Sequence, residues 1–207
     1  MPVVSRRQYL SSENNTMKTI RQFISRFGFP LLLTITIGAL CFANYTPNTW
    51  LSGWDTLHPE WNFSLAFERI FNGVWRTDQG LGAVAIQSHM ADLPRVALLW
   101  LLHFVLPPST LRYAFFFLML VAGPLGIYAF ARSARLSRSA AFIGSLVYLC
   151  NLGTLQHFIV PLEMFAVLYG LFPWLCLTII KNKLFYFAFL SFFASAMSHT
   201  ATLFYAH

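Results

Sequence analysis

The sequence predicts an all-α, polytopic integral membrane protein with about five transmembrane helices and with interfacial helices in a large first outer loop. Of its 207 residues, 57% are hydrophobic and only 10% are charged, against roughly 25% charged residues in an ordinary soluble domain. The apolar residues form runs that are separated by short basic clusters. The polar residues gather mainly in one stretch, residues 44–94.

The N-terminal segment, residues 1–26, is basic and forms the first predicted region. It contains one acid, Glu13, and its basic residues in order are Arg6, Arg7, Lys18, Arg21 and Arg26. The positive-inside rule therefore places this end in the cytoplasm. Met17, which is followed by Lys18, is an alternative start of the chain. Residues 27–43 are predicted to be an uncleaved membrane anchor, with a cleaved signal peptide as the alternative because Cys41-Phe42-Ala43 resembles a cleavage site.

The polar stretch and the apolar residues that follow it are predicted to carry two short helices in the first outer loop, residues 44–110. Residues 59–72 place Phe63, Phe67 and Ile70 on one face, with Glu60 and Glu68 largely away from it. Residues 95–106 are apolar but too short to cross about 30 Å of hydrocarbon, so they are predicted to form a second interfacial helix or a re-entrant one. This stretch also contains four of the six tryptophans, a residue type that favours the headgroup level.

The remaining apolar runs predict four further spans, over residues 111–131, 139–155, 159–180 and from 184 to the end. The basic clusters Arg132/Arg135/Arg138 and Lys181/Lys183 then face the cytoplasm together with the N-terminus. Residues 44–110 consequently lie outside, and we expect the inner membrane of a bacterial cell as the location. Because residues 27–207 stop within an apolar run, we expect this core to be the N-terminal part of a longer protein.

Asp55 is the predicted catalytic residue. A carboxylate just above the bilayer, among tryptophans, is partly desolvated, and desolvation raises the pKa toward a value that suits a general base. The alternative is that Asp55 or His58 caps the helix that begins at Pro59. The secondary candidates are Glu60, Asp78, Asp92 and His58. Asp78 has a basic neighbour, Arg76, and most such pairs are solvated loop contacts. For Asp92 the preferred interpretation is that it caps the second surface helix.

Arginines near the outer surface are the candidates for binding a phosphate group. Arg76 and Arg95 are assigned this role because a guanidinium group binds phosphate in a bidentate way. For Arg95 the alternative is that it only reaches toward lipid headgroups, and for Arg112 this second interpretation is preferred. Glu163 is predicted to lie at the water edge, since a carboxylate at mid-membrane costs about 2.5–3.5 kcal/mol.

No cofactor or resident metal is predicted. His58, His89 and Asp92 lack a metal-binding spacing such as His-x-x-x-His, so no metal ligands are assigned, and a divalent cation stays an open alternative. Nucleic acid is excluded as a partner because the net charge of +7 is divided among short runs between apolar segments and does not form one basic face.

The layout of the chain resembles the membrane-embedded C-type glycosyltransferase superfamily. An uncleaved first helix is followed by an acidic outer loop, Leu93-Pro94-Arg95 begins a short apolar helix, and a span ends in Ala-Arg-Ser-Ala-Arg-Leu. The loop is most similar to bacterial arabinofuranosyltransferase-type and YfhO-type members, in a resemblance that covers roughly residues 27–180 and that follows the layout more than any short motif. The loop residues that carry it are Asp55, Pro59-Glu60, Arg69, Trp75, Gly80-Leu81-Gly82 and Pro94.

This resemblance implies a sugar transfer from a polyprenyl-phosphate donor, with inversion, to a glycan or lipid acceptor at the outer face. It implies that Asp55 is the general base, and that the partners are the lipid-linked donor, membrane lipid and the acceptor. The chain lacks the paired acids, Asp-x-Asp or Glu-x-Asp, of commoner members and has fewer spans than they do. Two alternatives remain: a non-catalytic transporter or assembly factor for envelope glycans, and a membrane-anchored module whose tryptophans stack on sugar.

Overall fold

The computed structural model describes residues 27–52, 58–72, 75, 82 and 90–199, and the described part is all-α. It contains eight α-helices and two short 3-10 helices, and no strand occurs in these ranges. The predicted all-α class is therefore confirmed for the described residues.

Two helices are long and apolar enough to cross a membrane: α5 (Pro108–Ser133) with 26 residues and α8 (Glu163–Ile180) with 18. A third candidate span is the pair α6 (Arg138–Leu149) and α7 (Leu152–Ile159), which is bent by 48°. These two or three helices indicate a membrane protein. The other apolar helices are shorter; they are Phe27–Ala43, α4 (Leu93–His103) and α9 (Leu184–Phe193).

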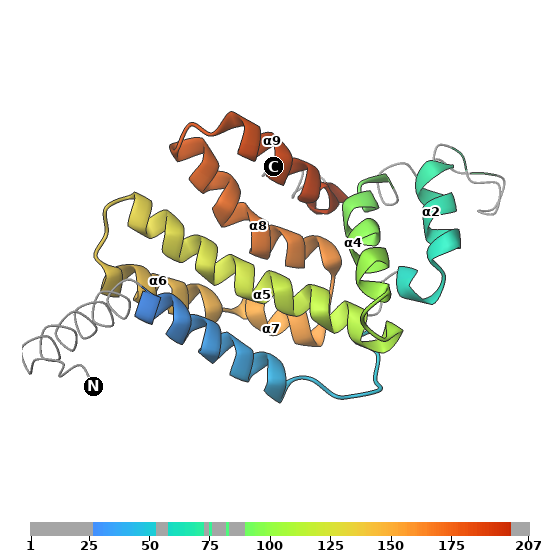
Figure 1. The fold of residues 1–207 in the computed structure, drawn as a ribbon, viewed down its shortest axis with the longest axis horizontal. Helices are drawn as coiled ribbons and strands as arrows, with labels where there is room; N and C mark the ends of the chain where they lie inside the picture. The colour runs from blue at the N-terminus through green and yellow to red at the C-terminus, as the bar shows by residue number, and fades with distance from the viewer. Residues whose placement is uncertain (1–26, 53–57, 73–74, 76–81, 83–89, 200–207) are drawn as a thin grey trace, which may run out of the picture.

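The long helix α5 lies at the centre of the bundle, between α8 on one side and α6 on the other (Figure 1). Glycines allow α5 and α8 to approach closely. A Cβ atom added at Gly123 would lie 2.7 Å from the backbone oxygen of Tyr169, and one at Gly170 would lie 2.6 Å from the sulfur of Met119. Such small residues are typical of helix contacts in membranes, where packing replaces the hydrophobic effect as the driving force.

The predicted boundary between the third and fourth spans is wrong. The sequence interpretation ended one span at residue 155 and began the next at 159, but both positions lie inside α7. Instead, α6 ends at Leu149, and α8 begins only at Glu163, after Pro161 and Leu162. The continuous apolar composition hid this break, which polar side chains such as Asn151 stabilise: its Nδ2 donates to the backbone oxygen of Tyr148 at 2.7 Å.

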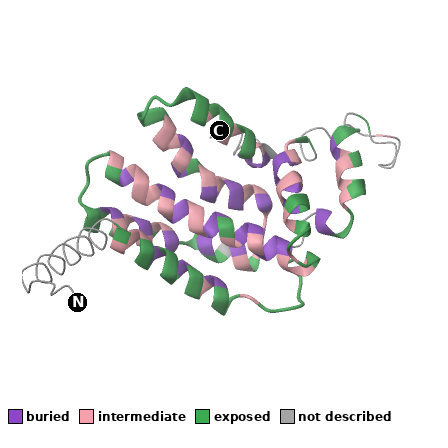
Figure 2. Cartoon of the chain, in the orientation of Figure 1, coloured by how far each residue is buried: buried purple, intermediate pink, exposed green. Residues whose placement is uncertain are grey.

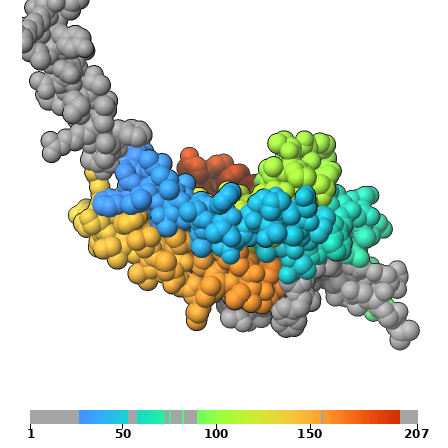
Figure 3. Space-filling view, turned by 90° about the horizontal axis from the view of Figure 1, so that it is seen from below, coloured from blue at the N-terminus to red at the C-terminus, as the bar shows by residue number. Residues whose placement is uncertain are grey.

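The helix Phe27–Ala43 packs along the outside of the bundle. Its side chains Leu33 and Ile37 are fully buried, and they share an apolar cluster with Leu120 of α5 and Leu149 of α6. Figure 3 shows this helix in blue, lying against the yellow and orange helices α6 and α7. The prediction of a helix over residues 27–43 is confirmed.

Two helices lie across one end of the bundle: α4 and α2 (Phe63–Phe71) (Figure 1). The expected helix over residues 59–72 is in fact two elements, a 3-10 turn η1 (Pro59–Trp61) followed by α2. The division occurs at Asn62, whose side chain accepts a hydrogen bond from the Leu65 amide and so caps α2. The expected apolar face is confirmed, since Phe63 and Phe67 contact the α4 rings of His103 and Trp100.

The C-terminal part of the described chain returns toward this same end. After α9, the 3-10 helix η2 (Ser195–His199) reaches α4, and Ser195 Oγ donates to the Ala91 backbone oxygen at 2.8 Å. The 18 residues of α8 span about 27 Å, and α9 with η2 runs back over a similar length of roughly 25 Å. The side chains of α9 are mostly exposed (Figure 2).

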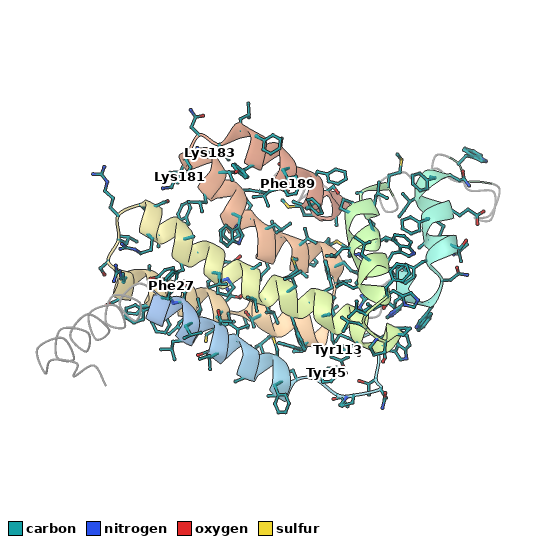
Figure 4. All side chains as sticks on the ribbon, viewed as in Figure 1. Phe27, Tyr45, Tyr113, Lys181, Lys183 and Phe189 are labelled. Atoms are coloured by element: carbon teal, nitrogen blue, oxygen red, sulfur yellow. The ribbon has the colours of Figure 1, made fainter. Side chains whose placement is uncertain are left out.

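The two ends of the bundle differ in charge. Lys181 and Lys183 lie at the end where Phe27 begins its helix, whereas Tyr45 and Tyr113 lie at the opposite end, beside α4 (Figure 4). Every described acid belongs to the α4 end: Glu60, Glu68, Asp92 and Glu163. The short connections at the opposite end contain Arg132, Arg135, Arg138, Lys181 and Lys183, and it is such clusters of Lys and Arg that the positive-inside rule counts.

Candidate functional site

Three of the predicted site residues, Asp55, Asp78 and Arg76, lie outside the described residues. The other four, His58, Glu60, Asp92 and Arg95, belong to the segments at the acidic end of the bundle. They meet there with two residues whose role the sequence did not predict.

These residues form a buried group of ion pairs, which we name the outer charge cluster. Its five members come from four elements: η1 supplies Glu60, the start of α4 supplies Asp92 and Arg95, and the first turns of α5 and α8 supply Arg112 and Glu163. All five side chains are buried, with Arg112 only 1% exposed. Buried charges persist only when opposite charges and hydrogen bonds compensate them.

Arg95 joins two carboxylates within this cluster. Its Nε donates to Asp92 Oδ1 at 2.6 Å and its Nη2 donates to Asp92 Oδ2, while its Nη1 lies 3.4 Å from Glu163 Oε1. Burial lowers the pKa of the Arg95 guanidinium, but the carboxylates of Asp92 and Glu163 outweigh burial and raise it above its ordinary value. Two of the three guanidinium nitrogens of Arg95 are therefore bonded to Asp92, and Nη1 has no hydrogen-bond partner among the described residues. Its assignment as a phosphate-binding residue stays a prediction.

Arg112 connects the bundle to the surface elements. Its Nη2 lies 2.6 Å from Glu163 Oε1 and donates to the Pro161 backbone oxygen at 3.0 Å, and its Nη1 lies 4.0 Å from Glu60 Oε1. Arg112 is buried and pairs with Glu163, so the interpretation that its side chain only reaches toward lipid headgroups is wrong. Glu163 is the first residue of α8, and its place at the water edge stays a prediction. The available signal was that two apolar helices that run in the same direction, α5 and α8, each carry one charge near their N-terminal end.

His58 and Asp92 do not cap helices with their side chains, which corrects the capping alternative for both residues. Instead, His58 Nδ1 lies 2.9 Å from Glu60 Oε1, and the Asp92 carboxylate accepts from Arg95. Glu60 is 4% exposed, although the sequence placed it on the polar face of a helix. The 3-10 turn has a different periodicity from α2 and directs Glu60 inward.

An aromatic stack lies beside this ion pair. The His58 ring stacks on the Trp61 ring with centroids 4.6 Å apart and an interplanar angle of 14°. Trp50 contacts Trp61 edge to face at 5.5 Å. Trp61 nevertheless remains 66% exposed, so one of its faces is fixed by protein and a large part of the indole is accessible. Fixed, accessible aromatic rings are suitable for contacts with the apolar faces of ligands.

A pocket of about 310 Å³ lies between η1, α2 and the start of α4. From α2 and its cap it is lined at helical spacing by Asn62, Leu65, Ala66, Arg69 and Ile70. The other lining residues that the structure describes are His58, Pro59, Trp61, Asp92 and Val96. The pocket thus borders both the aromatic stack and the outer charge cluster. Sequence reasoning did not single out Arg69 for any chemical role.

The described residues contain no group of three His, Cys, Asp or Glu side chains placed as metal ligands. The carboxylates of the outer charge cluster bond to arginines instead, which makes the cluster a structural connection between the surface helices and the bundle.

No protein-family model, curated protein or solved structure matches this chain. The glycosyltransferase resemblance therefore rests on the layout of the sequence alone.

Proposed function

We propose that this chain is, or is part of, a membrane glycosyltransferase of the C type. It would move a sugar from a polyprenyl-phosphate donor to a glycan or lipid acceptor at the outer face of a bacterial inner membrane. The observation that carries the proposal is the pocket at the acidic end of the bundle, which combines an accessible tryptophan, an arginine and a buried ion-pair cluster at the ends of the candidate spans.

In this proposal Asp55 is the general base. It lies three positions before His58, which lines the pocket. Its carboxylate takes the proton of an acceptor hydroxyl, and the oxygen attacks the anomeric carbon of the donor sugar from the side opposite the phosphate. The bond between that carbon and the phosphate oxygen breaks, polyprenyl phosphate leaves, and the configuration at the carbon inverts.

The proposal includes about five spans, with the N-terminus in the cytoplasm and residues 44–110 outside. Two features support this finer topology. The helix Phe27–Ala43 contains 17 residues and is therefore about 26 Å long, which is close to the thickness of the hydrocarbon core. The α9–η2 segment also runs back to the α4 end, where Ser195 contacts Ala91.

Replacing Asp55 tests the chemistry. We expect Asp55→Asn to lower transfer from a polyprenyl-phosphate sugar by roughly 10²–10⁴-fold in the natural full-length protein, because a positioned general base contributes about that factor. Glu68→Gln, in an exposed residue of α2, is the matched control and should leave transfer unchanged. If Asp55→Asn retains activity, the assignment of the base is wrong.

A binding module without catalysis is the second candidate function, favoured by the exposed and stacked Trp61. It predicts that the natural protein binds a polyprenyl-phosphate sugar without turnover. It also predicts that Trp61→Ala weakens this binding while Asp55→Asn does not. A non-catalytic transporter or assembly factor predicts neither turnover nor a binding loss in the Trp61 variant.

A further inference from the structure

Arg69 differs from the two arginines of the outer charge cluster. Arg95 and Arg112 each contact carboxylates, whereas Arg69 contacts none of the acidic side chains that the structure describes. Its Nε is buried and has no hydrogen-bond partner among the described residues. Arg95 Nη1 also lacks a hydrogen-bond partner there, but it lies 3.4 Å from Glu163 Oε1, whereas no described carboxylate forms an ion pair with Arg69. A buried N–H group without an acceptor is unfavourable by about 1–3 kcal/mol. The guanidinium group lines the pocket, so an acceptor bound there could remove this penalty.

The other polar groups of the pocket leave mainly donors available. Asp92 lines the pocket, but its two carboxylate oxygens already accept hydrogen bonds from Arg95. Asn62 uses its Oδ1 to accept from the Leu65 amide, which leaves the NH₂ group of the same side chain as a donor. The pocket therefore offers the Arg69 guanidinium and the Asn62 amide as donors, while the Asp92 carboxylate is already bonded to Arg95. Such a set of groups favours an anionic ligand.

We infer that Arg69 binds the phosphate group of a lipid-linked phosphate ester in this pocket. A guanidinium group offers a planar pair of donors that matches two phosphate oxygens. The rest of the lining is largely apolar or aromatic, with Leu65, Ala66, Ile70 and Val96 beside Trp61, which fits an organic group attached to the phosphate. The inference rests on the proposed function, because the donor would supply this phosphate, and it replaces Arg95 with Arg69 as the residue that holds it.

The test measures binding to the full chain purified into phosphatidylcholine nanodiscs, with farnesyl phosphate as the probe and farnesol as the uncharged control. We expect farnesyl phosphate to bind at least tenfold more tightly than farnesol. Arg69→Gln should remove this difference, and Arg69→Lys should keep part of it, because an ammonium group retains the charge without the planar fork. Glu68→Gln, the exposed neighbour on α2, should bind as the natural protein does.

Two further arms identify the source of the phosphate. If inorganic phosphate displaces farnesyl phosphate from the natural protein but not from Arg69→Gln, the phosphate site is supported and a free anion also fits it. If phosphatidylglycerol added to the nanodisc displaces farnesyl phosphate, the phosphate site is supported and also accepts a lipid headgroup. If no probe binds better than farnesol, or if Arg69→Gln binds farnesyl phosphate as tightly as the natural protein, the inference is overturned. Thermal unfolding of each variant confirms that it is folded.

The outcome is separable from that of the proposed function. If farnesyl phosphate binds in a way that depends on Arg69 but no sugar is transferred, the phosphate site is supported and the proposed transferase activity is rejected. Asp55-dependent transfer that Arg69→Gln does not affect would support the transferase and reject the role of Arg69.

Discussion

The hydroxyl group of Tyr148 donates a hydrogen bond of 2.8 Å to the backbone oxygen of Tyr169. In a regular helix this oxygen would accept from the amide four residues later, but that residue is Pro173, which has no N–H group. The hydroxyl of Tyr169 in turn donates to the Tyr148 backbone oxygen, at the point where α6 ends. Tyr148 therefore satisfies the carbonyl group that Pro173 leaves without its helical donor, while the Tyr148 carbonyl accepts from both Asn151 Nδ2 and the Tyr169 hydroxyl.

This exchange predicts a pair of variants that compensate each other. Tyr148→Phe should lower the free energy of unfolding by about 1–3 kcal/mol, because it leaves the Tyr169 carbonyl buried and unsatisfied. Combining it with Pro173→Ala should recover part of the loss, since alanine restores the helical donor. Chemical denaturation in detergent would measure the double-mutant cycle. Tyr186→Phe, in an exposed tyrosine of α9, is the control, and equal losses in the single and double variants would contradict the interpretation.

The outer charge cluster predicts a second effect on stability. Glu163→Gln should lower the free energy of unfolding by about 3–5 kcal/mol, because it leaves Arg95 and Arg112 buried with too few carboxylates. Thermal unfolding monitored by tryptophan fluorescence would measure this change. Glu68→Gln should change stability by less than about 0.5 kcal/mol. A Glu163→Gln protein as stable as the natural one would show that the cluster is not a stabilising connection.

Glycine contacts between α5 and α8 predict a third effect. Gly123→Ala should destabilise the bundle by about 1–3 kcal/mol, since the new methyl group would overlap with the backbone of Tyr169. Gly144→Ala is the matched control in α6, where no atom lies within 4 Å of an added Cβ. This control should be neutral or stabilising by up to about 1 kcal/mol, because alanine favours the helix. The same loss in both variants would mean that helix contacts do not cause it.

The charge difference between the two ends predicts an orientation that can be measured in cells. In a background without Cys41, Cys150 and Cys176, we expect Trp61→Cys to react with a membrane-impermeant maleimide in intact cells. Lys183→Cys should react only after permeabilisation, because Lys183 lies at the basic end of the bundle (Figure 4). Labelling of both variants in intact cells would contradict this topology.

Composition and charge patterning predicted the helical class, the central span and the amphipathic α2, because each depends on local periodicity. The same signals could not predict that Arg112 and Glu163 meet, since that contact depends on how α5 and α8 pack. They also missed the break at Cys150–Asn151, where polar side chains interrupt the helix without a change in overall hydropathy. Glu60 was placed on the wrong face because a 3-10 turn and an α-helix are difficult to distinguish over three residues.

The bond between Ser195 and the Ala91 carbonyl joins positions that are 104 residues apart. At a synthesis rate of about 5–20 residues per second, the ribosome needs roughly 5–20 s between making these two residues. The segment around α4 is thus synthesised before the 3-10 helix η2, which contacts it, exists. The α4 end of the bundle therefore acquires its last contact late, after η2 has been synthesised, and a ribosome stalled before Leu184 would present this end without the η2 contact.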